Sequence, residues 1–403
     1  MTSRKALTGL ILILLLLPGP LLSQNKNGDL DLAESLEIHG LVSTSFFLQD
    51  QSFGFSNGQN GTFIADQEKT DDPWFLGGDS RNTRLRLDLS GLPVEGQWEA
   101  SAHVEVDFFG GFKGTGAFSD EQAQIRLRHA YVELDRGKTS VVLGQTWAPL
   151  LGYVPASVSH IAFPLGYGSA GVVGWRFPGV QLIQELKSSE SLSATMRFAA
   201  MRGSWSGPGD NLASESAGEA AAFPQLEARL DLQGKSAGFS WSTYTVAHID
   251  KKDLSGTESP RGDEDELYGQ ALQIGGRVNV KKVTLQGNAY KGRAIGHQLG
   301  QLTQFGDIGS VGAWGQIGYR FTSRWSGWFF MGYGDPDDGE IRALETTGRL
   351  RNRSLAGMIR YDAGPLSLGL EWLGNRTEWT EADSPVRVRK GNQFALSALY
   401  SFL

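Results

Sequence analysis

Residues 82–109 read NTRLRLDLSGLPVEGQWEASAHVEVDFF and contain two runs in which apolar and polar side chains alternate. In the first run Leu85 and Leu87 share one face, and Arg84 and Arg86 share the other. In the second run, apolar residues at every other position from 98 to 108 alternate with polar or charged residues. A period of two predicts β-strands with one apolar and one polar side. Because the polar side is densely charged and the apolar side of the second run begins and ends in aromatics, the pattern is typical of membrane strands whose outside contacts lipid and whose inside lines water.

The first 23 residues have the pattern of a signal peptide. Arg4 and Lys5 precede an apolar run over residues 6–17, which ends at a Pro-Gly-Pro sequence. The run is shorter than the ~20 apolar residues that a spanning helix needs. We therefore expect residues 1–23 to be removed during export and residues 24–35 to form a short N-terminal extension. An uncleaved membrane anchor is the alternative.

Composition excludes several classes of protein. The 403 residues include 53 glycines and no cysteine, so a disulfide framework and lipid attachment through cysteine are both excluded. The formal net charge of −7 argues against nucleic acid as a partner. After Gln24 no apolar run is long enough for a spanning helix, which argues against a helical membrane protein.

From Leu36 to the end, alternating runs are separated in turn by long polar connections and very short turns. This layout predicts an all-β transmembrane antiparallel barrel of about sixteen strands over residues 36–403, with short periplasmic turns and long outer loops. An open sheet edge is not tolerated in hydrocarbon, so the first strand should pair with the last, at 393–402. A soluble β-protein is the alternative, although a sandwich rarely sustains this alternation through so many hairpins.

Three short strings carry a resemblance to a known family: DFFGG at 107–111, RLRHAYVE at 126–133 and LGQTW at 143–147. Together they resemble the DcaP-like porins, within the Gram-negative trimeric outer-membrane porin superfamily. The resemblance covers residues 80–150 and is architectural beyond them. It implies a homotrimer in the bacterial outer membrane that passes small hydrophilic solutes by passive diffusion, with a preference for dicarboxylates and other small anions. The helical segment that usually precedes the barrel in that family is reduced or absent here.

In such porins the loop after the fifth strand folds inward and narrows the channel. The resemblance places this constriction loop at residues 148–171, including Tyr153, His160 and Tyr167. The stretch is unusually apolar for a loop in water, which suits a segment packed against the inner wall. An outer loop buried against a neighbouring subunit is the alternative.

The strand pattern also predicts which charged side chains line the pore. The inward set is Arg84, Arg86, Asp88, Glu105, Asp107, Arg126, Arg128, Arg197 and Arg229. Arginine carries a permanent charge and a planar fork that binds carboxylates through two parallel hydrogen bonds. The arginines at 84, 86, 126 and 128 are therefore candidates for an anion filter. Alternatively, they pair with the acids of neighbouring strands and brace the wall.

No catalytic, metal or cofactor motif stands out in the sequence. We therefore predict a porin that is not an enzyme and has no cofactor, and whose partners are anionic solutes, outer-membrane lipid and lipopolysaccharide. Inward glycines, at 275, 318, 332, 334 and 369, favour an open bore over a plugged one. A plugged barrel that acts as an anchor or adhesin, or an outer-membrane hydrolase, is the alternative.

Overall fold

The computed structural model describes residues 35–54, 58–66, 74–110, 123–189, 191–203, 216–255, 265–344, 347–381 and 386–402. The chain divides into two compact units, residues 1–36 and 37–403, and the barrel belongs to the second. The predicted signal peptide and nearly all of the predicted extension lie outside the described residues. No helix in the described part of the chain is long and apolar enough to cross a membrane.

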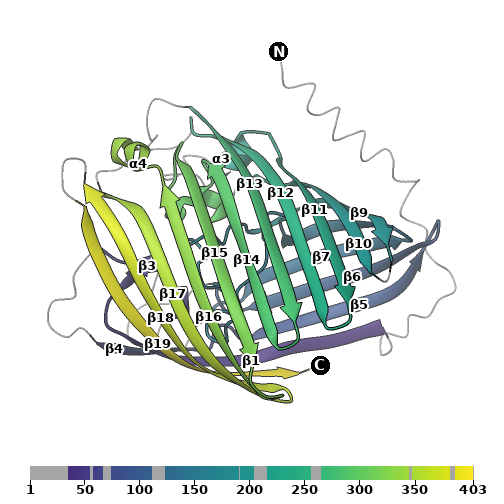
Figure 1. Ribbon diagram of the computed structural model, residues 1–403. Coiled ribbons are helices and arrows are strands. Elements are labelled where there is room, and N and C mark those ends of the chain that lie inside the picture. Colours follow the sequence, from purple (N-terminus) through teal and green to yellow (C-terminus); the bar gives the residue numbers. More distant parts are fainter. Residues whose placement is uncertain are drawn as a thin grey trace. The chain divides into compact units, whose positions relative to one another are not determined.

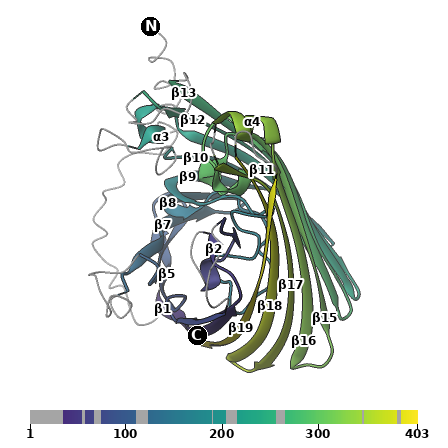
Figure 2. The same cartoon turned by 90° about the vertical axis from the view of Figure 1, so that its left-hand side faces the viewer.

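Sixteen antiparallel strands of the described residues form one closed sheet (Figures 1 and 2). In chain order they are β1 (Leu36–Gln49), β5 (Arg84–Val94), β6 (Trp98–Asp107), β7 (Arg126–Arg136), β8 (Thr139–Trp147), β9 (Arg176–Ser188), β10 (Leu192–Met201), β11 (Gln225–Ser236), β12 (Phe239–Asp253), β13 (Glu266–Val280), β14 (Val283–Arg293), β15 (Gly309–Arg320), β16 (Trp325–Pro336), β17 (Thr347–Ala363), β18 (Leu366–Glu381) and β19 (Arg387–Phe402). A short strand, β4 (Phe75–Asp79), pairs with β1 just before β5 begins. The all-β barrel of about sixteen strands predicted from the sequence is confirmed.

The ring closes where β1 meets β19. Their pairing runs from Gly40 opposite Phe402 to Gln49 opposite Gln393, and Ser45 and Ser397 share a hydrogen bond of 2.6 Å between their buried hydroxyls. The predicted closure is therefore confirmed. The last strand begins at Arg387, earlier than predicted, because the alternation continues through residues assigned to the preceding loop.

The alternation places apolar side chains outside and polar or small ones inside. In β13, Leu272 and Ile274 are 61% and 59% exposed, whereas Ala271 and Gln273 between them are 8% and 0% exposed. Successive side chains of a strand point to opposite faces of the sheet, so the exposed and the buried residues of β13 lie on its outer and inner faces. The exposed apolar face is the inverse of a soluble protein's surface and suits contact with lipid.

The turn between the two alternating runs of residues 82–109 is short. β5 continues to Val94 through a bulge between Leu89 and Leu92, where Gly91 has a φ of 76°. The bulge absorbs the extra residues within the strand. The chain then reverses over residues 95–97.

The barrel interior contains chain segments as well as wall side chains. Residues 50–54 and 58–66 carry β2 (Phe53–Gly54), η1 (Gly58–Asn60) and β3 (Phe63–Ile64), and Figure 2 shows β2 within the ring of strands. Residues 294–308 carry η3 (Gly296–Gln298) and η4 (Gln301–Thr303). Residues 148–175, here called the inner segment, contribute Leu165, Tyr167 and Val172 to an apolar cluster with residues of both other segments. Two short helices, α3 (Ala217–Ala220) and α4 (Asp338–Leu344), lie in long connections.

We predict that cysteines at positions 45 and 397 form a disulfide that closes the barrel. The two residues are directly opposite in the antiparallel pairing, where Cα atoms lie about 4.5–5.5 Å apart, within the range that a disulfide spans. Ser45→Cys with Ser397→Cys should give a shifted band on a boiled non-reducing gel that reverts with reductant. The cysteine-free chain supplies a clean background.

The matched control is Ser45→Cys with Ser401→Cys. Ser401 lies four residues further along β19 and opposite Leu41. It is therefore about 13 Å from Ser397 along the strand, at roughly 3.3 Å per residue. Cross-linking of the control pair but not of the 45/397 pair would show that the register is wrong.

Candidate functional site

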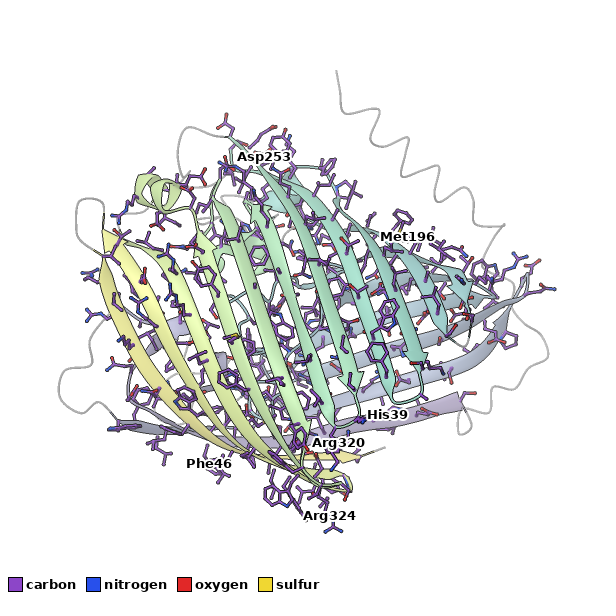
Figure 3. The ribbon with its side chains drawn as sticks, in the orientation of Figure 1. His39, Phe46, Met196, Asp253, Arg320 and Arg324 are labelled. Atoms are coloured by element: carbon purple, nitrogen blue, oxygen red, sulfur yellow. The ribbon has the colours of Figure 1, made fainter. Side chains whose placement is uncertain are left out.

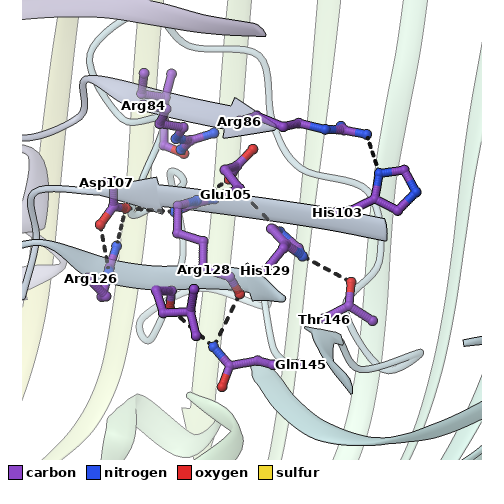
Figure 4. A network of polar contacts seen from close by, with 12 residues as sticks. Arg84, Arg86, His103, Glu105, Asp107, Arg126, Arg128, His129, Gln145 and Thr146 are labelled. Carbon is purple, nitrogen blue, oxygen red and sulfur yellow. Dashed lines mark hydrogen bonds and ion pairs between the residues drawn. The ribbon is translucent and has the colours of Figure 1, made fainter. Parts of the chain in front are cut away.

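Charged side chains gather on the inner face of β5, β6 and β7 (Figure 4). Arg84 lies opposite Asp107, and Arg86 lies opposite Glu105. Directly opposite residues of antiparallel strands have their side chains on the same face, within reach of each other. The sequence pattern R-L-R-L-D facing E-V-D thus places cations and acids side by side within the barrel.

A bulge between β6 and β7 places one more polar side chain, His129, on the inner face than strict alternation predicts. Glu105 lies opposite His129 and Asp107 lies opposite Arg126, so Arg128 has no partner in the ladder. Arg128 is 3% exposed and bonds to both acids, so it also faces inward. The bulge therefore brings Arg128 and the adjacent His129 to the same side, and His129 contacts the Thr146 hydroxyl at 3.0 Å.

Asp107 is the centre of this group. Arg126 donates two hydrogen bonds to its carboxylate, at 2.9 and 2.6 Å, and Arg128 donates a third at 2.9 Å. Arg128 also binds Glu105. Removal of one partner from such buried, bidentate pairs leaves an uncompensated charge, which typically costs several kcal/mol. Arg126 and Arg128 therefore stabilise the barrel wall through these ion pairs, independently of any effect on passing ions.

Two more arginines lie beside this group without an ion-pair partner among the described residues. Arg84 donates to the Ile161 carbonyl of the inner segment at 2.6 Å. Arg176, at the start of β9, is 4% exposed, and its guanidinium lies 4.4 Å from the Trp147 ring centre and 4.8 Å from that of Trp175. Both interact electrostatically with Arg126 and Arg128. The four arginines at 84, 126, 128 and 176 thus share two carboxylates, and we call these six residues the arginine cluster.

The remaining predicted pore-lining residues form smaller groups. Arg86 donates to Asp88 at 2.8 Å, and Asp88 also contacts His103. Arg229 binds Asp231 and donates to the Pro149 and Leu151 carbonyls of the inner segment, at 2.9 Å each. Arg197 lies directly opposite Arg229. The structure therefore brings together the residues at 84, 105, 107, 126 and 128, and places Arg197 and Arg229 in a separate group.

Wall carboxylates hold the backbone of the inner segment. Glu371 of β18 accepts hydrogen bonds from the Ser157 hydroxyl at 2.7 Å and from the Val158 and Ser159 amides at 2.6 and 2.8 Å. Glu227 of β11 accepts from the Leu150 amide at 2.6 Å. These contacts satisfy backbone groups that would otherwise be buried without partners. Both acids therefore hold the inner segment in place.

The three predicted loop residues all pack inside the barrel. The Tyr153 hydroxyl donates to Ser242 at 2.6 Å, and the Tyr167 hydroxyl donates to the Gly174 carbonyl at 2.5 Å. His160 lies between the Gln59 carbonyl and the Gln393 side chain, at 3.1 and 2.9 Å. Burial lowers the pKa of His160 and raises the pKa of Tyr167. Burial in the inner segment therefore favours the neutral forms of His160 and Tyr167.

The interpretation of inward glycines as signs of an open bore is wrong. A Cβ at Gly332 would lie 2.6 Å from the Ala170 side chain, and one at Gly369 would lie 2.8 Å from Val158, both in the inner segment. At Gly334 it would meet the Ser169 carbonyl. The glycines at 275 and 318 leave room for aromatic rings of the wall. These positions are small because another part of the chain lies against them.

Sequence reasoning missed Arg176, His129 and the partners of Glu371. Arg176 lies five residues beyond the predicted loop, which ends at 171, and its position after Trp175 was a weak signal for an aromatic-stacked cation. His129 was missed because only the bulge reverses its side. Among the described residues no group of three or more His, Cys, Asp or Glu side chains could hold a metal ion.

Comparison with solved structures shows the same architecture. The outer membrane channel DcaP of Acinetobacter baumannii superposes with a TM-score of 0.64 at 18% identity, over 91% of this chain and 97% of that one. The fold is that of an outer-membrane porin. The anion-selective porin of Comamonas acidovorans matches with a TM-score of 0.58 at 13% identity, over 91% and 99% of the two chains. OmpT of Vibrio cholerae in its trimer form matches with 0.52 at 11% identity, over the same shares.

The predicted resemblance to DcaP-like porins is confirmed at the level of the fold. No protein-family model matches the chain, and no curated protein matches it. At these sequence identities the similarity shows the porin fold alone. The solute has to be inferred from the residues of this chain.

We predict that Glu371→Gln loosens the inner segment. The amide keeps one acceptor oxygen and loses the charge, whereas hydrogen bonds to charged groups contribute about 1.5–3 kcal/mol each. Exchange of the Val158 and Ser159 amide hydrogens should accelerate at least about tenfold, which corresponds to about 1.4 kcal/mol. Hydrogen-exchange mass spectrometry of the protein in detergent measures this.

Glu133→Gln is the matched control, because Glu133 is an interior carboxyl of β7 and makes no hydrogen bond to the inner segment among the described residues. The control should leave exchange in residues 148–175 unchanged. Equal protection in native protein and Glu371→Gln would mean that the apolar contacts alone hold the segment.

Proposed function

We propose that the protein is an outer-membrane porin through which small hydrophilic solutes diffuse, with a preference for anions such as dicarboxylates. The observation that carries this proposal is the arginine cluster, in which four permanent positive charges share two carboxylates. The surplus charge raises the local concentration of anions in a narrow, water-filled passage. The porin of Comamonas acidovorans, which shares this fold, is anion-selective, and that supports the same preference.

The inner segment is proposed to be the constriction. It crosses from β8 to β9 while bonding to β5, β11, β15 and β18. Because it occupies interior space on these strands, solutes are confined to the remainder of the bore, beside the arginine cluster. Dicarboxylates suit this wall, because arginine binds carboxylates through paired N–H groups.

The apolar cluster in the interior favours a second candidate, a plugged barrel that serves as an anchor. Phe53, Tyr167, Trp314 and Phe330 meet there, as in a packed core. The two candidates differ in one measurement, since a plugged barrel gives no conductance in a planar bilayer. The charge-selectivity experiment below therefore tests both.

We predict that Arg84→Gln combined with Arg176→Gln lowers the anion-over-cation permeability ratio. Neither arginine has a carboxylate partner among the described residues, so both can be removed without an acid being stranded. A unit charge about 10 Å from the path contributes roughly 1–2 kcal/mol at an effective dielectric near 20. The ratio, from reversal potentials in a salt gradient, should fall about tenfold and the difference should shrink at 1 M salt.

Arg320→Gln is the control, because Arg320 is exposed at the short-turn end of β15 (Figure 3), a strand that carries no residue of the arginine cluster. Arg126 and Arg128 are poorer choices, because their removal would leave Asp107 and Glu105 unpaired. An unchanged reversal potential in the 84/176 variant would contradict the anion preference. Absence of any conductance in the native protein would favour the plugged barrel.

We also propose a homotrimer. OmpT of Vibrio cholerae was solved in a trimer form, and closed cyclic symmetry is the ordinary arrangement of identical subunits. The outer face of β6 and β7 carries small alanines, at 100, 102 and 130, which permit close approach of another copy. Native mass spectrometry in mild detergent should show three copies, and Ala102→Trp should shift the distribution towards monomers. A monomer in native protein would contradict the proposal.

A further inference from the structure

Three cations form a row on the outer surface of the barrel. Arg353 of β17 lies directly opposite Arg376 of β18, which lies directly opposite Lys390 of β19. They share the face of Leu355 and Phe394, which are 41% and 42% exposed. The residues between them along the strands, such as Asn352, Asn375 and Gln393, are buried inside. The three side chains therefore point away from the bore, and we call them the cationic row.

The cationic row lies at the upper edge of the apolar band. Arg353 is ten residues from the end of β17 at Ala363, and Arg376 is ten residues from the start of β18 at Leu366, both at the short-turn side. Ten residues at about 3.3 Å each, in strands tilted about 40°, rise about 25 Å. This is the height of the lipid-facing band of such barrels. The row is therefore level with the headgroups of the outer leaflet.

The described residues balance only part of the charge of the row. Arg376 pairs with Glu378, but neither Arg353 nor Lys390 has an ion-pair partner among the described residues. In the next row, further from the short turns, the charge of Arg351 is balanced, because Arg351 lies between Asp335 and Glu378, at 2.9 and 3.2 Å. Like charges directly opposite each other across strands destabilise a sheet. An external anion at the cationic row would remove this repulsion.

An apolar groove runs across the same outer face, below the row. It has a volume of about 520 Å³ and is lined by residues of β15 to β19, among them Ile317, Phe329, Gly357, Leu370 and Phe394. Its floor at Gly357 is open, since a Cβ there would meet nothing within 4 Å. Gly357 is opposite Trp372, which is opposite Phe394. On each strand these residues lie two lipid-facing positions from the cationic row. An acyl chain in the groove would thus end at the cations.

We propose that the cationic row and the groove together bind a phosphorylated lipid of the outer leaflet, with phosphate on Arg353, Arg376 and Lys390 and an acyl chain in the groove. Arginine binds phosphate oxygens through two parallel N–H groups, and lysine supplies a compact charge beside it. The apolar groove selects a lipid over free phosphate, because inorganic phosphate would leave it empty. The contact is direct, with no bridging divalent cation. It stands apart from the proposed channel activity, because lipid binding and conductance are measured separately.

The test measures binding of diphosphorylated lipid A to the purified protein in detergent by native mass spectrometry, in the presence of EDTA. Arg353→Gln with Lys390→Gln should weaken binding at least tenfold. Neither side chain has an ion-pair partner among the described residues, although the Arg353 guanidinium lies over the Tyr333 ring, 5.7 Å from its centre. The slower gel migration after boiling verifies that each variant is folded. Arg324→Gln, in the exposed turn at the opposite end of the barrel (Figure 3), should bind like native protein.

Two further measurements distinguish the contribution of the groove from that of the cationic row. Gly357→Leu adds a side chain to the groove at a position where a Cβ meets nothing within 4 Å, and it should weaken lipid binding while the cationic row stays intact. Lipid A without phosphates should bind weakly to native protein and to the 353/390 variant alike, and millimolar inorganic phosphate should not compete. Equal affinity of native protein and the 353/390 variant would overturn the proposal. So would binding that EDTA abolishes, or equal binding of the two lipids by native protein.

Discussion

Every backbone N–H and C=O group of this barrel that faces hydrocarbon must find its partner within the sheet, because water is absent there. Pairing of β1 with β19 meets that constraint by removing both edges. Closure then determines the side-chain pattern, because the face turned to lipid must be apolar and the enclosed face can be polar. The exposed Leu272 and Ile274 beside the buried Gln273 are a consequence of closure and not of a packed core.

Enclosure also creates a second demand inside the barrel. The inner segment brings its own backbone groups into a space where water is limited, and they need partners as well. Wall side chains supply them: Glu371 binds two amides, and Gln316 both donates to and accepts from the backbone of Ala156. Arg84 and Arg229 bind carbonyls of the same segment. Interior charges thus have two roles, since a residue that holds the segment also contributes to the electric field inside the barrel.

The period of two in the sequence predicts the strands, their number and the side on which most residues lie, because strand geometry translates spacing directly into direction. It could not predict the bulge that moves His129 inward, since one extra residue reverses the parity of everything after it. It also could not predict that Gly369 makes room for Val158, or that Glu371 binds Ser159, because these contacts join residues more than 200 positions apart. Alternation indicates a side of the sheet, whereas a partner across the bore depends on how the inner segment folds.

The register gives similar residues different roles on the two faces of the barrel. Inside, Asp107 is directly opposite both Arg84 and Arg126, so positive and negative charges meet and part of the positive charge is compensated by neighbouring side chains. Outside, Arg353, Arg376 and Lys390 are opposite one another, so the register itself creates repulsion. A lipid-facing cation also loses hydration at the edge of the apolar band, which makes an unpaired charge more costly there than in bulk water. A register that brings opposite charges together satisfies many of them within the wall, whereas one that brings like charges together on the outer face favours an anion from the surroundings.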